Sequence, residues 1–276
     1  MSKKNIKVIN KKSFQAFAAR WAKTLPPARP AKEDIIIYRK LFNQYKNRTG
    51  KTKLLILGAT PELRDLPASL KFDVTVVDFN IEMIRALTPL RKTKSKEKVI
   101  VSWWQKIPLK DHYDIVAGDV AVNMLDKKDI PALFKRINFL LAPGGVFIHR
   151  DAFYNAKKKV GAKKAIKAWR QHKIDIGDFR WLIELYSQYK SYNPKTGVDS
   201  KTLLYKNVHK MYEQGLLTKA ELDQFGVFND NVKITILTQP AWQKLYSKFF
   251  NLVKCVKPKG HIFCQDLPVC VYKRNN

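Results

Sequence analysis

Short apolar runs, separated by segments with helical spacing, dominate the first half of the chain. Each run is apolar at nearly every position, as strands are when helices cover both faces of their sheet. Five strands are predicted at Lys53–Leu57, Val74–Asp78, Val99–Ser102, Asp114–Ala117 and Val146–His149. Strands that alternate with helices form right-handed βαβ units, so the pattern predicts a parallel sheet.

The helices around these strands are predicted from apolar stripes and from residues that begin or end a helix. Ser13 can cap a first helix, which ends at Pro26-Pro27. Thr60 can cap another, with Pro61 at its first position, where the missing N–H costs nothing. Three further helices are expected at Lys32–Tyr45, Ile81–Leu87 and Ile130–Leu140.

The second half of the chain changes character. Residues 156–250 have a mostly helical pattern and are basic and aromatic, and lysines crowd a helix at Lys157–Arg170. Two more helices are expected around Gly215. The last part predicts a strand, a helix and a closing edge strand or hairpin, at Lys233–Leu237, Ala241–Val253, and His261–Cys264 with Val269–Tyr272.

Four parts of the chain follow from these patterns. Residues 1–50 form basic N-terminal helices, and residues 51–155 form an α/β core of the Rossmann type. Residues 156–232 form a helical, basic and aromatic cap, and residues 233–276 supply strands and a helix that complete the sheet.

Length and composition agree with a large folded domain that carries an insertion. The 276 residues are 45% hydrophobic and 12% aromatic, which supports a core and argues against global disorder. No apolar run approaches the roughly 18 residues of a membrane span, so we expect a cytoplasmic protein. Cys255, Cys264 and Cys270 have no C-x-x-C spacing, which predicts reduced thiols and neither a disulfide framework nor a zinc site.

Charge is the unusual bulk property of the chain. Lysine and arginine together number 53 against 23 aspartate and glutamate, which gives a net charge of +30. A surface this positive attracts polyanions, so nucleic acid is one partner that the charge allows. The excess of lysine over arginine instead favours a surface whose charges only keep the protein hydrated, because arginine recognises phosphates and bases better than lysine does.

One stretch gives the clearest sign of a ligand. The strand Lys53–Leu57 ends at Gly58, a helix begins directly afterwards, and the next strand ends at Asp78, twenty positions after Gly58. In an open α/β sheet such a turn lets a ligand approach the backbone, and such a carboxylate meets ribose hydroxyls. The spacing therefore predicts a cofactor that contains adenosine.

These features, together with Leu141-Ala142-Pro143-Gly144-Gly145 before the fifth strand, resemble the class I S-adenosylmethionine-dependent methyltransferases. The resemblance covers residues 13–153. It implies a Rossmann-like, doubly wound and mostly parallel seven-stranded sheet whose last strand is antiparallel. It further implies that S-adenosyl-L-methionine is the cofactor, that the N-terminal helices form a lid over it, and that the helical insertion caps the substrate.

The resemblance also implies which residues meet the cofactor. Gly58 and Ala59 would form the turn below it, and Asp78 would accept hydrogen bonds from both ribose hydroxyls. The full expected set is Gly58, Ala59, Thr60, Asp78, Phe79, Trp103, Trp104 and Asp119. Two departures stand out: Trp103 lies where the family often has an acidic residue, and Gly58 lacks the companion glycines of such turns. The chain also has no G-x-G-x-x-G, which separates it from dinucleotide oxidoreductases.

Polar residues after the fourth and fifth strands are candidates for the acceptor side. Asp119 lies where ligands bind in open α/β sheets, and its carboxylate can meet the cofactor's ammonium group. His149 and Asp151 can act as base and orienter, and Asn123 and Arg150 are expected at the substrate. The structural alternatives are a helix cap at Asn123, and a sheet edge and helix start at His149 and Asp151.

The sequence thus predicts an enzyme that moves a methyl group from S-adenosylmethionine to an oxygen or nitrogen nucleophile, with a small-molecule acceptor favoured and no metal. Three alternatives stay open: a basic RNA-binding protein or RNA methyltransferase, a non-catalytic binding protein of the same fold, and a polyamine synthase. The strongly cationic chain disfavours a polycationic substrate. The acceptor and the oligomeric state are left open.

Overall fold

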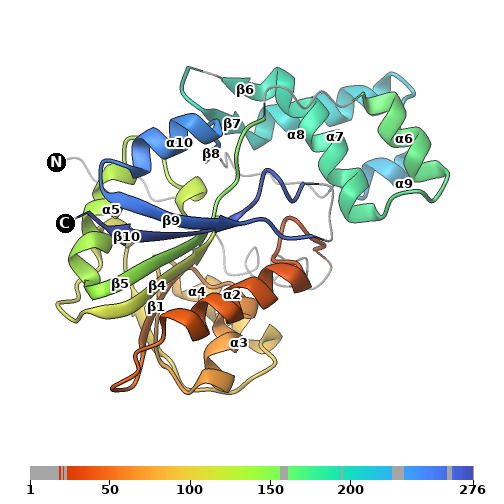
Figure 1. The fold of residues 1–276 in the computed structure, drawn as a ribbon. Coiled ribbons are helices and arrows are strands. Elements are labelled where there is room, and N and C mark those ends of the chain that lie inside the picture. Colours follow the sequence, from red (N-terminus) through yellow and green to blue (C-terminus); the bar gives the residue numbers. More distant parts are fainter. Residues whose placement is uncertain are drawn as a thin grey trace.

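A seven-stranded sheet forms the centre of the molecule in this computed structural model (Figure 1). The structure describes residues 19, 21, 24–155, 161–193, 195–225, 233–259 and 263–275. The strand order is β3 (Lys98–Val101), β2 (Asp73–Asp78), β1 (Lys53–Leu57), β4 (Tyr113–Asp119), β5 (Leu141–Arg150), β10 (Val269–Arg274) and β9 (Phe250–Val256). The first five pair in parallel, and β10 runs antiparallel to both neighbours. The predicted fold class, including the antiparallel closing strand, is confirmed.

Helices cover both faces of this sheet (Figure 1). One face carries α2 (Lys32–Tyr45), α3 (Pro61–Leu70) and α4 (Ile81–Leu87), and the other carries α5 (Ile130–Leu140) and α10 (Gln239–Tyr246). Short 3₁₀ turns follow α4, β3 and β4, at Thr88–Leu90, Trp104–Lys106 and Val122–Met124. Among the described helices, none combines the length and apolar character that a bilayer crossing needs.

Strand β1 shows why the strands are almost continuously apolar. Leu54 and Ile56 belong to the core beneath α2 and α3, whereas Leu55 and Leu57 belong to the core beneath α5. Successive side chains of a strand point to opposite faces, so a strand between two helical layers buries every position. The same reason explains why the strands could be located from the sequence.

The predicted cap is helical, and it also carries a small sheet of its own. Its helices are α6 (Ala162–Arg170), α7 (Ile176–Ser191), α8 (Lys201–Glu213) and α9 (Lys219–Leu222). The small sheet joins β6 (Tyr192–Asn193), β7 (Val198–Ser200) and β8 (Lys233–Thr235). Strand β8 was expected in the last part of the chain, and it pairs with β7 rather than with the central sheet.

Three expectations for the C-terminal half of the chain were wrong. The helix expected to run to Val253 ends at Tyr246, and the strand β9 begins at Phe250. The fifth strand was expected to begin at Val146, but β5 begins at Leu141 and includes the expected turn, where Gly144 has a φ of +77° and the strand shifts register against β4. Cys255 and Cys270, expected as free thiols, face each other across β9 and β10 and form a disulfide. Spacing along the chain could not show this pair because strand pairing brings the two residues together.

Part of the N-terminal expectation lies outside the described residues. The helix start expected at Ser13 lies outside the described residues, whereas residues 19 and 21 are described and are helical. Lysines 157–159 of the basic helix and residues 261–262 of the expected closing strand also lie outside the described ranges.

Candidate functional site

The carboxyl ends of β1, β2, β4 and β5 meet at one edge of the central sheet, where open α/β sheets bind ligands. We call the side chains gathered there the strand-end site. Its members are Asp34, Tyr38, Gly58, Asp78, Phe79, Trp103, Trp104, Asp119, His149, Arg150 and Asp151. The structure therefore brings most of the predicted site residues to one edge and adds Asp34 and Tyr38 from α2.

Gly58 makes the sharp turn that the sequence predicted after β1. Its φ is +93°, a conformation that favours glycine, and its N–H donates to the carbonyl of Val77 at 2.9 Å. A Cβ at this position would lie 3.6 Å from the Trp104 ring. Thr60 precedes α3 as expected, but its side chain forms no capping hydrogen bond. The turn is therefore held by its backbone, with an aromatic ring directly above it.

Asp78 ends β2 beside this turn, because β1 and β2 pair Leu57 with Val77. The residue is only 7% exposed, and its Oδ1 accepts the backbone N–H of Asn80 at 2.9 Å. Burial raises the pKa of Asp78 to about 6, and backbone donors at Asn80 and Phe79 act in the opposite direction. A desolvated carboxylate next to a glycine turn is well placed to accept hydrogen bonds from a ligand's hydroxyls.

Three aromatic side chains surround the turn and the carboxylate. The Trp104 Nε1–H donates to the Val77 carbonyl at 2.8 Å. Phe79 and Trp103 stack face to face, with ring centres 4.5 Å apart and planes within 3°. Both rings are about half exposed, at 46% and 45%. Because the two rings touch each other, a flat ligand enters between them only if they separate.

Arg150 lies at the centre of a buried ion cluster at the ends of β4 and β5. Its side chain is fully buried, and it binds both carboxylate oxygens of Asp119 at 2.5 and 3.1 Å. It also donates to Asp34 Oδ2 at 3.0 Å. Burial lowers the pKa of Arg150, but the charges of Asp119 and Asp34 outweigh this effect and raise it. Asp119 thus faces the site as one partner of an ion pair.

Asp34 leaves this cluster with one unused acceptor. It is fully buried, its Oδ2 accepts the Ala31 N–H at 2.7 Å, and its Oδ1 has no hydrogen-bond partner. Burial raises the pKa of Asp34, while the charge of Arg150 acts against this. Two carboxylates and one guanidinium carry a net charge of about −1 when ionised. An unpaired buried oxygen is costly, so a cationic donor would be favourable there.

His149 and Asp151 form a second buried network, which the structure closes within the protein. The ring Nε2 of His149 accepts the N–H of Val122 at 3.2 Å, so its Nδ1 carries the proton towards Asp151 at 2.8 Å. Asp151 also accepts hydrogen bonds from Tyr246 at 2.7 Å and from Tyr272 at 3.1 Å. Both nitrogens of the expected base therefore have partners, and both residues are fully buried.

Gly118 explains why the histidine fits so closely behind the site. A Cβ on Gly118 would lie 3.0 Å from the His149 ring and 3.1 Å from the Cβ of Ala121. The chain then turns through Val120, whose φ of +54° is rare for a β-branched residue. Such strain is found where the surrounding structure must hold a functional segment in place.

Asn123, expected at the substrate, instead ties two backbone segments together. Its amide donates to the carbonyls of Ala152 at 3.0 Å and Thr235 at 2.9 Å, and its oxygen accepts the Ala152 N–H at 3.1 Å. The residue is fully buried. It fixes the chain after β5 against β8 and does not open onto the site.

Sequence reasoning missed Asp34 and Tyr38. The Tyr38 hydroxyl donates to the Gly118 carbonyl at 2.7 Å and accepts the Arg150 N–H at 2.9 Å. One signal was available, because the two residues lie four positions apart on α2 and share a helix face with its apolar stripe. A polar pair on a buried face indicates a polar partner across the interface.

Comparison with known proteins finds similarity in structure alone. No protein-family model matches the chain, and no curated protein matches it in sequence. The methyltransferase CcbJ of Streptomyces caelestis matches with a TM-score of 0.62 and 12% identity over 97% of this chain and 100% of its own. A S-adenosylmethionine-dependent methyltransferase of Clostridium acetobutylicum ATCC 824 matches with a TM-score of 0.56 and 16% identity over 96% and 100%.

A third solved structure, described as a putative Zn-dependent alcohol dehydrogenase of Rhodobacter sphaeroides, matches with a TM-score of 0.60 and 15% identity over 97% and 100%. Identities this low speak for the fold and leave the activity open. The strand order, the antiparallel β10 and these matches agree with one another. The chain has the fold of the class I S-adenosylmethionine-dependent methyltransferases.

Proposed function

We propose that this protein is a methyltransferase that binds S-adenosylmethionine at the strand-end site. The observation that carries the proposal is the adjacency of the Gly58 turn and the buried Asp78 carboxylate at the ends of two paired parallel strands. Such a pair suits a nucleoside, since the turn admits the ligand to the backbone and the carboxylate accepts from ribose hydroxyls. The similar Clostridium protein is described as dependent on the same cofactor, which supports the proposal.

The charges of the site fit this cofactor. S-adenosylmethionine carries a sulfonium and an ammonium, and the Asp34–Asp119–Arg150 cluster has a net charge of about −1 with a free acceptor at Asp34 Oδ1. The cluster therefore has a negative charge although the chain as a whole has a net charge of +30. Attraction between opposite charges in a region of low dielectric favours the cationic ligand there.

The rings near Asp78 would hold the adenine and exclude water. We infer that Phe79 and Trp103 separate when the cofactor enters and that Trp104 then covers the ribose above Gly58. When adenine replaces the contact between the two half-exposed rings, each ring still stacks on one face, so little buried apolar surface is lost.

The cofactor supplies a methyl group on a positively charged sulfur, which a nucleophile displaces. The protein then needs mainly to position the acceptor, and we propose an oxygen or nitrogen nucleophile of a small molecule. Because both His149 nitrogens are bonded inside the protein, we assign His149 and Asp151 to positioning: they hold the turn at Val122 behind Asp119. The zinc-enzyme match adds no second candidate, since no group of three metal-ligating side chains is found within the described ranges.

Isothermal titration calorimetry with S-adenosylhomocysteine and S-adenosylmethionine tests the proposal. We expect micromolar binding by the wild type and a loss of at least about a hundredfold in Asp78→Ala, because two hydrogen bonds to a charged group contribute about 1.5–3 kcal/mol each. Asp223→Ala is the matched control, since Asp223 is exposed and pairs with Lys219 far from the site in sequence. Unchanged affinity in Asp78→Ala would refute the ribose assignment, and a wild type that binds neither compound would refute the cofactor.

A further inference from the structure

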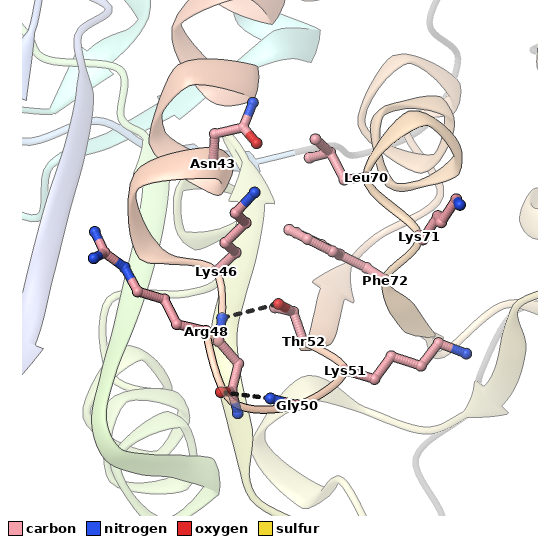
Figure 2. Close-up of a pocket in the computed structure, with 10 residues that line it drawn as sticks. Asn43, Lys46, Arg48, Gly50, Lys51, Thr52, Leu70, Lys71 and Phe72 are labelled. Atoms are coloured by element: carbon pink, nitrogen blue, oxygen red, sulfur yellow. Dashed lines mark hydrogen bonds between the residues drawn. The ribbon is translucent and has the colours of Figure 1, made fainter.

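A second concave surface lies at the opposite edge of the sheet from the strand-end site. It is a cavity of about 480 Å³ where α2 and α3 end and where β1 and β2 begin. Figure 2 shows it between Lys46, Leu70, Thr52 and Phe72. The full length of β1 separates it from Gly58, so this surface and the strand-end site are independent places on the molecule.

Four cations line this cavity: Lys46, Arg48, Lys51 and Lys71, which we call the basic hollow. The residues that line it include no aspartate or glutamate. All four side chains are exposed, and none forms an ion pair with a described carboxylate. Figure 2 shows the Lys46 side chain beside Asn43, and the charged ends of Arg48, Lys51 and Lys71 pointing outward into solvent.

The four cations of the basic hollow are more than is needed to neutralise the negative ends of the neighbouring helices. The carboxyl ends of α2 and α3 meet here, and each contributes about half a negative charge, so the two ends offset about one of the four cations. Asp73 and Asp114 lie next to the hollow, and Lys53 follows its lining residues. Counting all of these leaves a local excess of about two positive charges.

Hydrogen bonds hold the loop between α2 and β1, which carries three of the four cations. Asn47 Oδ1 accepts from the N–H groups of Thr49 at 3.0 Å and Gly50 at 3.2 Å, and its Nδ2 donates to Asp114 at 3.3 Å. The Asn47 N–H donates to the Thr52 hydroxyl at 2.9 Å (Figure 2). A loop fixed in this way holds the bases of these side chains at set positions, so a ligand need not order the backbone on binding.

We propose that the basic hollow docks the phosphates of a nucleic-acid strand. Phosphate contacts by lysine need no geometry beyond point charges, and the net charge of +30 attracts a polyanion from a distance. The floor residue Phe72 is 8% exposed and offers no face for stacking a base, so the contacts carry no sequence preference. The surface tethers a nucleic acid at the far edge of the sheet whether or not the strand-end site transfers methyl groups.

Fluorescence anisotropy with a labelled single-stranded RNA of about 20 nucleotides measures this docking across a salt series. The test variant replaces Lys46, Arg48, Lys51 and Lys71 with glutamine. We expect its affinity at about 0.1 M salt to fall at least tenfold and its logarithmic salt slope to shrink by up to about 3, at about 0.7 for each phosphate that the variant no longer neutralises. If this variant loses its circular dichroism signal, the Lys46→Gln, Lys71→Gln double variant replaces it, with a slope smaller by about 1.4.

A matched control removes the same charge from the cap, with glutamine at Lys163, Lys164, Lys167 and Lys210, all of them exposed. We expect this control to bind within about threefold of the wild type. Equal losses in the two variants would show diffuse attraction and overturn the proposal, as would a larger loss in the control. It is also overturned if the wild type binds no RNA, or if the hollow governs binding to phosphatidylglycerol vesicles and not to RNA.

Discussion

Asp78 carries a charge that the folded protein disfavours. Burial raises its pKa from 3.8 to about 6, so the folded state holds the proton more tightly than the unfolded chain does. The free energy of unfolding should therefore fall as the pH rises from about 4 to about 6 and stay level above that. The difference between the two pKa values corresponds to about 3 kcal/mol at neutral pH.

We expect Asp78→Asn to be more stable than the wild type at about pH 7.5, by up to about 3 kcal/mol, and equally stable near pH 4. Asparagine keeps an oxygen for the Asn80 N–H and has no charge to desolvate. Urea unfolding followed by fluorescence at several pH values between these limits measures the difference. A variant less stable than the wild type at every pH would show that the carboxylate is not desolvated in the folded state.

At the residue scale the sequence predicted positions better than roles. Gly58 follows β1 and Asp78 ends β2, and a strand end can be located from an apolar run, so the sequence located both positions. Arg150 and Asp34 are 116 positions apart, and only the docking of α2 on the sheet brings them together. The sequence left His149 open between a catalytic base and a structural residue at the sheet edge. The N–H of Val122 on its Nε2 favours the second.

Helix α2 is the element that closes the strand-end site on the side of Arg150. Its Tyr38 hydroxyl bridges two adjacent strands, donating to the carbonyl of Gly118 in β4 and accepting from the N–H of Arg150 in β5. Asp34, one turn earlier, binds the Arg150 side chain. The helix therefore recognises the ends of β4 and β5 through polar contacts, in addition to its apolar stripe at Leu41 and Phe42.

We expect Tyr38→Phe to lower the free energy of unfolding by about 2–6 kcal/mol, because it leaves one buried carbonyl and one buried N–H unsatisfied at about 1–3 kcal/mol each. Urea unfolding at neutral pH measures the loss. Tyr45→Phe on the same helix is the control: Tyr45 is half-buried, and we expect a change within about 0.5 kcal/mol. Similar values for the two variants would mean that the bridge at Gly118 and Arg150 adds no stability.

The elements of the first half were predictable because two helical layers impose a simple pattern on the strands between them. Strand β9 (Phe250–Val256) does not show this pattern, because it lies at the edge of the sheet with Leu252 and Val253 exposed. Its apolar residues were mistaken for the end of a helix. The two-residue and three-residue strands of the small sheet are too short to show a period. Their pairing depends on contacts between segments far apart in the chain, which no local pattern encodes.

Two ends of the central sheet carry opposite kinds of surface. The carboxyl end gathers buried carboxylates around one arginine, and the amino end gathers exposed cations around a fixed loop. The proposed methyl transfer and the proposed polyanion docking therefore use separate surfaces. A nucleic-acid strand docked at the basic hollow reaches the strand-end site only by running the length of the sheet. The hollow therefore suits anchoring of the nucleic acid better than binding of a methyl acceptor.

The cap buries apolar side chains in a core that is separate from the two cores of the sheet. Its members all lie between Ala162 and Phe225, with the fully buried Phe179 ring stacked on Trp169 at 5.1 Å and against Phe225 at 5.7 Å. A smaller cluster joins it to the sheet, where Trp181 packs on Phe263. Separate cores allow residues 162–225 to unfold locally while the sheet stays folded.

We expect Phe179→Ala to speed amide exchange in α6, α7 and α8 and to leave β1, β4 and β5 protected, because the loss of about 3–5 kcal/mol falls on the cap's own core. Hydrogen exchange followed by mass spectrometry resolves these segments. Phe134→Ala is the matched control: this ring is equally buried, but it packs between α5 and the sheet, so exchange should rise in β4 and β5. If Phe179→Ala instead speeds exchange in the cap and the sheet alike, the core of the cap and the cores of the sheet unfold as one cooperative unit.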